Sequence, residues 1–147
     1  MKNAKPKILI GRTDVVDFPK LDLLGIDIKI DSGAYTSSIH CHHIIEENNI
    51  LKCLFLDPKH QDFHQKPLIF SDFKQKNVKS SNGVVEKRYL IKTEILIFNR
   101  IRAIELTITE RGSMRFPVLL GRKFLSRKFI IDTSKKDLSL TNNITKI

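Results

Sequence analysis

Apolar and polar residues alternate along much of the chain, which is the period of a strand with one buried face. In residues 26–30, three isoleucines alternate with an aspartate and a lysine. Short runs bounded by turn residues predict further strands, over 7–10, 15–18, 51–56, 68–73, 78–80, 84–98 and 101–109. Between them we expect a connection over 19–24, one helical turn over 44–49 and a polar loop over 60–66. Many short strands with little helix predict an all-β domain, closed or sandwiched.

Two hairpins and one short helix complete the predicted elements. Asn82-Gly83 is the sharpest turn signal, because this pair suits the left-handed backbone of a two-residue hairpin loop. A second hairpin is expected around Asn99-Arg100. Nearer the end of the chain, the apolar run 116–120 closes at Gly121 and leads into a helix-like segment.

Length and composition predict a single domain over residues 1–147, because 41% apolar residues suffice for one core. The net charge of +10 favours a polyanionic partner: nucleic acid, a membrane surface or an acidic polypeptide. Two cysteines make no disulfide framework and suit a reducing cytoplasm. The apolar run 8–10 is too short for a signal peptide, and no run reaches the ~20 apolar residues of a membrane helix. We therefore expect a cytoplasmic protein with no membrane partner.

Asp31 is the leading candidate for chemistry. The strand 26–30 delivers it directly into a Ser32-Gly33 turn followed by small residues, an arrangement that holds a carboxylate rigidly at a strand end. Asp-Ser-Gly alone is also an ordinary strand-ending turn. The apolar segment 116–125, with its internal glycine, supplies a second element that favours the catalytic interpretation.

Together these two elements resemble the retroviral-type, pepsin-like aspartic proteases, in which an Asp-Ser/Thr-Gly-Ala turn sits beneath an apolar-apolar-Gly-Arg segment leading into a helix. The chain is more similar still to a bacterial family named ATP-dependent zinc proteases and also described as retropepsin-like. The matching stretches cover almost the whole chain: 8–12, 30–34, 36–37, 39–40, 80–83, 111–117, 120–122 and 130–132. Ser32 stands where many relatives have Thr, which keeps the hydroxyl.

The resemblance implies an all-β acid-protease fold: a closed, barrel-like domain with one short helix in its C-terminal half. It implies that Asp31 is catalytic, with active-site support from Ser32, Gly33, Ala34, Leu120 and Gly121. Peptidases of this type use two facing carboxylates, and one Asp-Ser-Gly in the chain then implies a symmetric homodimer. The internal competitor, Asp132-Thr133-Ser134, has serine where the turn needs glycine, and we expect it to be a strand-ending turn.

The implied chemistry is hydrolysis without a covalent intermediate, a cofactor or a metal ligand. Two carboxylates about 3 Å apart cannot both ionise, so they share a proton. The ionised one removes a proton from water, and the protonated one donates to the scissile carbonyl or leaving nitrogen. Neither Gly11-Arg12-Thr13 nor Gly121-Arg122-Lys123 is a phosphate-cradling loop, so any ATP dependence would come from a partner.

By resemblance, such proteins are associated with enzymes that ligate glutamate to protein tails. That implies an acidic or polyglutamylated protein substrate and a glutamate-ligase partner. The candidate contacts to acidic substrate are Arg88, Arg111, Arg115 and Arg122, since guanidinium groups bind carboxylates in bidentate fashion. For each of them an ordinary surface or structural ion pair is an open alternative.

Three questions stay open at this stage. A zinc-dependent hydrolase is one alternative, from metal-capable residues within 25 positions: His40, Cys41, His42, His43, Cys53, His60 and His64. There is no His-Glu-x-x-His motif, however. A non-catalytic basic β-domain that binds a ribosome or nucleic acid is another, weakened by the lack of Trp for base stacking. The resembled fold also has a hairpin over its cleft, either the Asn82-Gly83 hairpin or the loop 57–66.

Overall fold

The computed structural model describes residues 5–56, 58, 60–79, 83–110 and 116–141. In these ranges it contains eleven strands, one α-helix and two 3-10 turns. The strands are β1 (Ile8–Ile10), β2 (Thr13–Phe18), β3 (Leu23–Ile30), β4 (Ser37–Glu47), β5 (Ile50–Phe55), β6 (Leu68–Phe70), β7 (Lys74–Lys79), β8 (Val85–Ile97), β9 (Arg100–Thr109), β10 (Val118–Leu120) and β11 (Phe129–Ile131). The helix is α1 (Arg122–Leu125), and the 3-10 turns are η1 (Pro19–Leu21) and η2 (Leu138–Leu140).

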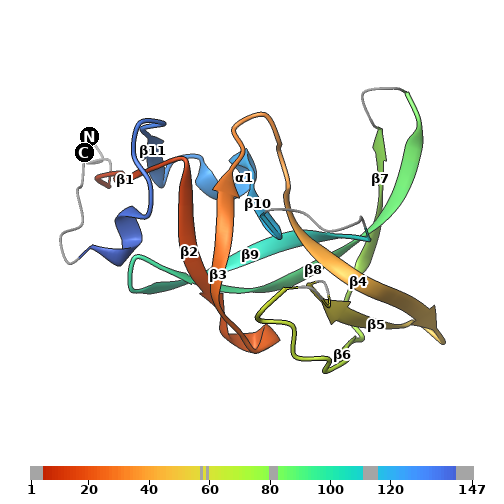
Figure 1. The fold of residues 1–147 in the computed structure, drawn as a ribbon. Helices are drawn as coiled ribbons and strands as arrows, with labels where there is room; N and C mark the ends of the chain where they lie inside the picture. Colours follow the sequence, from red (N-terminus) through yellow and green to blue (C-terminus); the bar gives the residue numbers. More distant parts are fainter. Residues whose placement is uncertain (1–4, 57, 59, 80–82, 111–115, 142–147) are drawn as a thin grey trace.

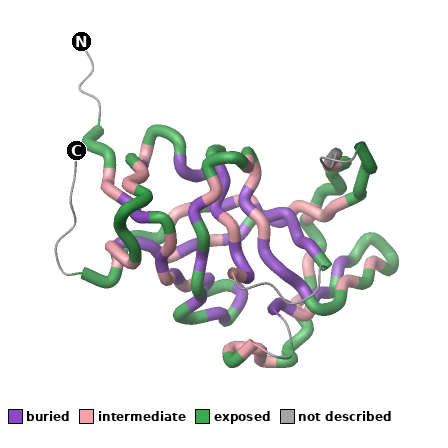
Figure 2. The backbone as a smooth tube through the Cα atoms, turned by 45° about the horizontal axis from the view of Figure 1, so that its top comes forward, coloured by how far each residue is buried: buried purple, intermediate pink, exposed green. Residues whose placement is uncertain are grey.

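Six strands close into a barrel in the order β10-β3-β2-β8-β9-β4, and β4 returns to pair with β10 (Figure 1). The pairings of β3 with β10 and of β4 with β9 are parallel, and the others in the ring are antiparallel. Alternate residues of each strand point inward, so the buried positions concentrate in the barrel strands (Figure 2). The prediction of an all-β, closed acid-protease fold with one short helix in the C-terminal half is confirmed.

β4 runs beyond the barrel, where β5 pairs with it and β6 pairs with β5 to form a side sheet (Figure 1). The helical turn expected over 44–49 is therefore wrong. β4 continues to Glu47, Asn48 and Asn49 form a two-residue turn with φ of 52° and 60°, and β5 begins at Ile50. Asparagine tolerates this left-handed backbone, and pairing with β5 outweighs the local polar pattern.

Other predicted element boundaries also differ from those in the structure. The loop of the β8–β9 hairpin is Phe98-Asn99, with φ of 51° and 57°, because Ile97 pairs with Arg100. β3 begins at Leu23, inside the expected connection. Lys74–Lys79 forms β7, which starts earlier than the predicted strand over 78–80 and pairs with β8 beyond the barrel. Part of the Asn82-Gly83 turn lies outside the described residues.

β1 and β11 form a parallel two-stranded sheet at the end of the barrel where the described chain begins and ends (Figure 1). Asp132 follows β11 and accepts hydrogen bonds from the N–H (3.0 Å) and hydroxyl (2.6 Å) of Ser134, so this segment is the expected strand-ending turn. Next to it, the hydroxyl of Ser139 in η2 donates to the buried carboxylate of Asp14 on β2. These contacts tie the C-terminal segment to the barrel. No helix in the described residues is long and apolar enough to cross a membrane.

Candidate active site

Asp31 directly follows β3, and hydrogen bonds on both sides hold it in place. Its backbone N–H donates to the carbonyl of Leu120 on β10 at 2.9 Å. Its carboxylate accepts the N–H of Gly33 at 3.0 Å, and its carbonyl accepts the N–H of Ala34 at 3.2 Å. The side chain is half-buried, whereas Ser32 and Gly33 are exposed. The carboxylate is therefore fixed in direction while one side of it stays open.

Gly121, between β10 and α1, lets this segment approach the turn closely. A Cβ built there would lie 2.7 Å from the Tyr35 carbonyl oxygen and 2.9 Å from that of Ala34. The backbone of Gly121 is extended, with φ of −97°, so the lack of space rather than a left-handed conformation requires glycine. Its N–H donates at 3.0 Å to the buried hydroxyl of Ser37, 84 residues earlier.

The next two residues continue this contact. The N–H groups of Arg122 and Lys123 donate to the carbonyls of Ala34 and Tyr35, each at 2.9 Å. The Arg122 guanidinium also donates to the Ser32 carbonyl at 3.0 Å and lies 5.8 Å from the centroid of the Tyr35 ring. Arg122 thus braces the turn from outside.

The structure therefore brings together most of the residues that the sequence singled out. Asp31, Ser32, Gly33, Ala34, Leu120, Gly121 and Arg122 form one contiguous site. Arg88 lies on β8 and pairs with Glu86 of the same strand at 3.2 Å. Arg111 and Arg115 lie outside the described residues.

Sequence reasoning missed Ser37 and Tyr35. Ser37 supplies the acceptor for Gly121, and Tyr35 is an exposed ring beside the carboxylate turn. The available signals were the matching stretch 36–37 and the position of both residues shortly after Asp31. Neither signal identifies which hydroxyl turns inward.

The β7–β8 hairpin is the candidate cover that contacts the turn. Lys76 on β7 donates to the Thr36 hydroxyl at 3.0 Å, and its ammonium lies 5.9 Å from the centroid of the Tyr35 ring. The loop over 60–66 instead contacts η1 and its C-terminal end. His64 Nε2 lies 3.1 Å from the Leu21 carbonyl, and Lys66 pairs with Asp22 at 2.8 Å.

The histidines and cysteines do not gather into a ligand set. Cys41 and Cys53 are buried, and the hydrogen bond between their thiols, followed by burial, raises the pKa of Cys41. His60 and His64 lie in a coil, and each accepts a hydrogen bond at Nδ1 from a nearby backbone N–H. Within the described ranges no group of three or more His, Cys, Asp or Glu side chains is placed to hold a metal ion. The zinc alternative thus has no ligand set in that part of the chain.

A comparison with protein families shows where this chain belongs. The family described as "Retropepsin-like aspartic endopeptidase RimB" matches residues 9–141. The chain belongs to this RimB-like family.

The chain is also similar to longer proteins and to a solved structure. Proteins named "Probable alpha-L-glutamate ligase" match from Shewanella halifaxensis, 36% identical over 135 residues, and from Desulfotalea psychrophila, 30% identical over 145. The matches cover 88% and 86% of this chain but only 29% and 28% of those proteins, so the chain spans less than a third of their length. A crystal structure of a Legionella pneumophila protein of unknown function (DUF785) has a TM-score of 0.61 at 22% identity, covering 89% of this chain and 97% of that one. At that identity it supports the fold alone.

Proposed function

We propose that the chain is an aspartic-type peptidase in which the Asp31 carboxylates of two copies share one catalytic water. The observation that carries the proposal is the braced Asp31 turn. Its carboxylate accepts the Gly33 N–H at 3.0 Å, its backbone is tied to β10, and α1 covers the neighbouring carbonyls. Preorganised groups of this kind catalyse well because little reorganisation is left for the reaction step.

A second copy would complete the site. The described part of the chain holds one Asp-Ser-Gly turn, and its exposed residues Ser32, Gly33 and Tyr35 leave room for a two-fold partner. With two carboxylates in contact, one holds the shared proton. The ionised carboxylate takes a proton from water as the oxygen adds to the scissile carbonyl carbon, and the protonated one donates to the carbonyl oxygen. When the tetrahedral intermediate collapses, the carboxyl that took the proton from water donates it to the leaving nitrogen and the C–N bond breaks. A hydroxyl of the intermediate returns its proton to the other carboxylate, which restores the pair.

We propose an acidic protein tail as the substrate, with peptide or glutamyl bonds as the bonds cleaved. The net charge of +10 favours such a substrate. In the relatives, the segment similar to this chain is part of a longer protein named as a glutamate ligase, which supports a related substrate and a glutamate-ligase partner for this chain. Arg111, Arg115, Arg122 and Arg88 remain the proposed contacts, and Arg122 has guanidinium donors beyond the one that binds Ser32.

Mass spectrometry of a glutamate-tailed peptide tests the proposal, using wild-type protein, Asp31→Asn and the matched control Asp132→Asn. Asp132 also ends a strand and accepts two hydrogen bonds in its turn, but it lies outside the site. We expect cleavage by the wild-type and control proteins, with and without a zinc chelator, and none by Asp31→Asn. Cleavage by pure Asp31→Asn would refute the proposal, and loss on chelation would favour the zinc alternative.

The oligomeric state tests the shared carboxylate pair separately. Sedimentation at increasing protein concentration should reveal a dimer, stabilised by an uncleavable acidic peptide. A protein that stays monomeric under all these conditions while it cleaves the peptide would rule out the shared pair.

A further inference from the structure

A groove of about 300 Å³ lies on the outer face of the β8–β9 ribbon, beside α1. Two of the residues that line it also contact the active-site turn or the segment packed against that turn. Ser37 lines the groove and also accepts the Gly121 N–H, while Lys123 lines it and donates its backbone N–H to Tyr35 of the turn. The groove is thus separate from the Asp31 carboxylate but coupled to the same supports.

Lysines dominate the rim of this groove. Lys123 pairs with Glu105 at 2.7 Å, and Lys92 lies directly opposite Glu105 in the strand register. The Lys123 ammonium, with smaller contributions from Lys92 and Lys74, lowers the pKa of the Glu105 carboxyl. One carboxylate therefore faces several ammonium groups, and positive charge is left in excess.

Lys128 closes the other end of the rim. Its ammonium donates to the Phe124 carbonyl at 2.8 Å and lies 4.5 Å from the centroid of the Phe124 ring. Burial, and then the neighbouring charge of Arg102, lowers the pKa of Lys128. An anion placed beside Lys128 would counter the repulsion from Arg102 and favour the charged ammonium.

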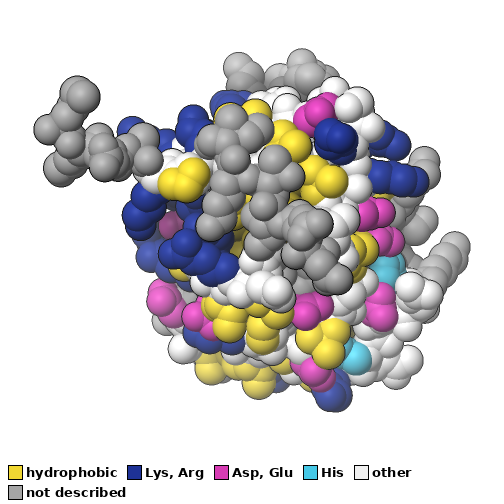
Figure 3. Space-filling view, turned by 90° about the vertical axis from the view of Figure 1, so that its left-hand side faces the viewer, with side chains coloured by type: hydrophobic (Ala, Val, Ile, Leu, Met, Phe, Trp, Pro, Cys, Tyr) yellow, Lys and Arg dark blue, Asp and Glu magenta, His cyan; other side chains and the backbone are white. Residues whose placement is uncertain are grey.

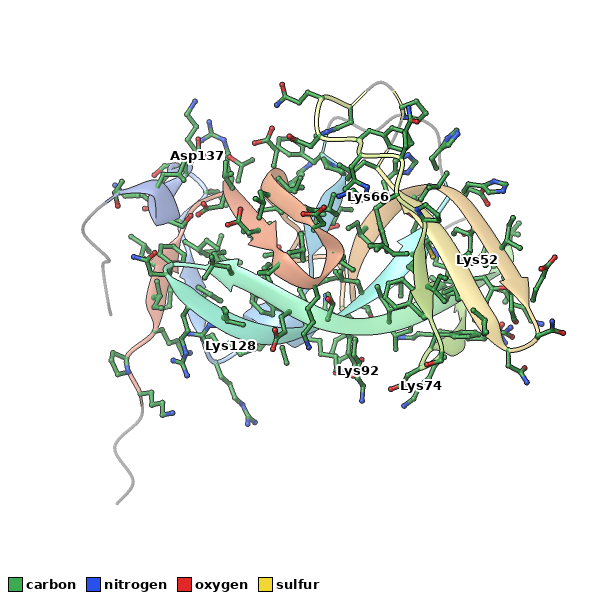
Figure 4. The ribbon with its side chains drawn as sticks, turned by 90° about the horizontal axis from the view of Figure 1, so that it is seen from below. Lys52, Lys66, Lys74, Lys92, Lys128 and Asp137 are labelled. Atoms are coloured by element: carbon green, nitrogen blue, oxygen red, sulfur yellow. The ribbon has the colours of Figure 1, made fainter. Side chains whose placement is uncertain are left out.

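Lysines extend beyond the groove along the same edge of the barrel (Figure 4). Lys128, Lys92 and Lys74 lie along one edge of the barrel, while Asp137 and Lys66 lie across the molecule from them (Figure 4). Figure 3 views the end that carries β1 and β11. In that view Lys and Arg side chains gather on the left, which is the side of this edge. A ligand several residues long could therefore contact more than one of these lysines.

We propose that this groove binds an acidic stretch of polypeptide outside the catalytic cleft. The inference rests on the proposed function, because the stretch is taken to belong to the substrate that Asp31 cleaves. The groove would hold a glutamate-rich segment while another part of the same chain enters the cleft. Such a second contact raises the effective concentration of the substrate at the cleft.

The floor of the groove favours polypeptide over nucleic acid. Ala103, Ile104 and Phe124 form its apolar part, and Phe124 is only 4% exposed. The methylene groups of glutamate can pack on such a floor while their carboxylates reach the lysines. Nucleic-acid bases stack on exposed aromatic rings, and none of the residues that line this groove presents one.

Fluorescence anisotropy with a fluorescein-labelled decaglutamate peptide tests the groove directly. The Asp31→Asn protein is used as the background, so that binding is measured without cleavage. In that background we expect Lys92→Gln to weaken binding about threefold, and Lys92→Gln with Lys128→Gln about tenfold, because rim charges contribute modestly and are screened by salt. The matched control is Lys52→Gln, an exposed strand lysine on β5, and it should change the dissociation constant less than about twofold.

Several results would overturn the groove proposal. They are no binding of decaglutamate, equal losses in the Lys52 and Lys92 variants, and tighter binding of a single-stranded oligonucleotide with the same number of charges. If loss of the Lys128 hydrogen bond destabilises the fold, Lys92→Gln alone keeps the test decisive, because the Lys92 side chain is exposed.

Kinetics with Asp31 intact separate this inference from the proposed function. Lys92→Gln should raise KM for a long glutamate-tailed substrate and leave kcat unchanged, with no effect on a short substrate that lacks the tail. Lysine-dependent binding without any cleavage would refute the peptidase and leave the groove standing. Cleavage with an unchanged KM would refute only the groove.

Discussion

Gly121→Ala tests whether close contact between α1 and the Asp31 turn holds the site together. The new methyl group would lie 2.7 Å from the Tyr35 carbonyl oxygen and 2.8 Å from its carbon, well short of the 3.4 Å at which ordinary contact begins. These atoms belong to the backbone, so they cannot move aside as the end of a flexible side chain could. Either the turn or the start of α1 must shift.

The expected cost follows from two contributions. Overpacking of this kind costs roughly 1–3 kcal/mol. A shift also weakens the hydrogen bonds from Arg122 and Lys123 to Ala34 and Tyr35, each worth about 0.5–1.5 kcal/mol. We therefore expect Gly121→Ala to lower the free energy of unfolding by about 3 kcal/mol. For a chain of this length, that lowers the Tm by roughly 6–12 °C.

Urea denaturation followed by circular dichroism measures this loss. Gly25→Ala is the matched control, because Gly25 has a left-handed φ of +67° and open space around its Cβ position. It should cost about 1 kcal/mol from backbone strain alone. If Gly121→Ala were as stable as wild type, or no less stable than Gly25→Ala, the contact would not be the constraint that we infer.

Three further predictions concern the surroundings of the site. Ser37→Ala leaves the Gly121 N–H without its buried acceptor and should cost about 1–3 kcal/mol in urea denaturation; a loss below about 0.5 kcal/mol would contradict that role. Lys123 lowers the folded-state pKa of Glu105, so this pair should stabilise the fold above the unfolded pKa of Glu105 and lose that effect as the pH falls through the folded pKa. Glu105→Gln should therefore reduce the pH dependence of the Tm in the acid range, and an unchanged profile would argue against it. Lys76→Met removes the contact between the β7–β8 hairpin and the turn, and should speed amide hydrogen exchange in that hairpin but not in the barrel.

Local sequence patterns predicted strands well where burial alternates, and less well where pairing partners are distant. The strand before Asp31 follows directly from its alternating isoleucines, and it was found with only its start displaced. The helical turn predicted over 44–49 is wrong, and Glu46 and Glu47 lie in β4. Pairing of β4 with β5 makes them strand instead, since β propensity depends on the neighbouring strand more than on local composition.

The sequence by itself determined the all-β class, the Asp31 turn and the glycine that the neighbouring segment needs. These follow from local periodicity and from the backbone freedom of particular residues. Only the tertiary structure decided that Ser37 receives the Gly121 N–H, that Lys76 brings the β7–β8 hairpin to the turn, and that a lysine-rimmed groove lies behind it. The physical reason is that closure of the barrel joins residues far apart in the chain, and no local pattern encodes which of them will meet.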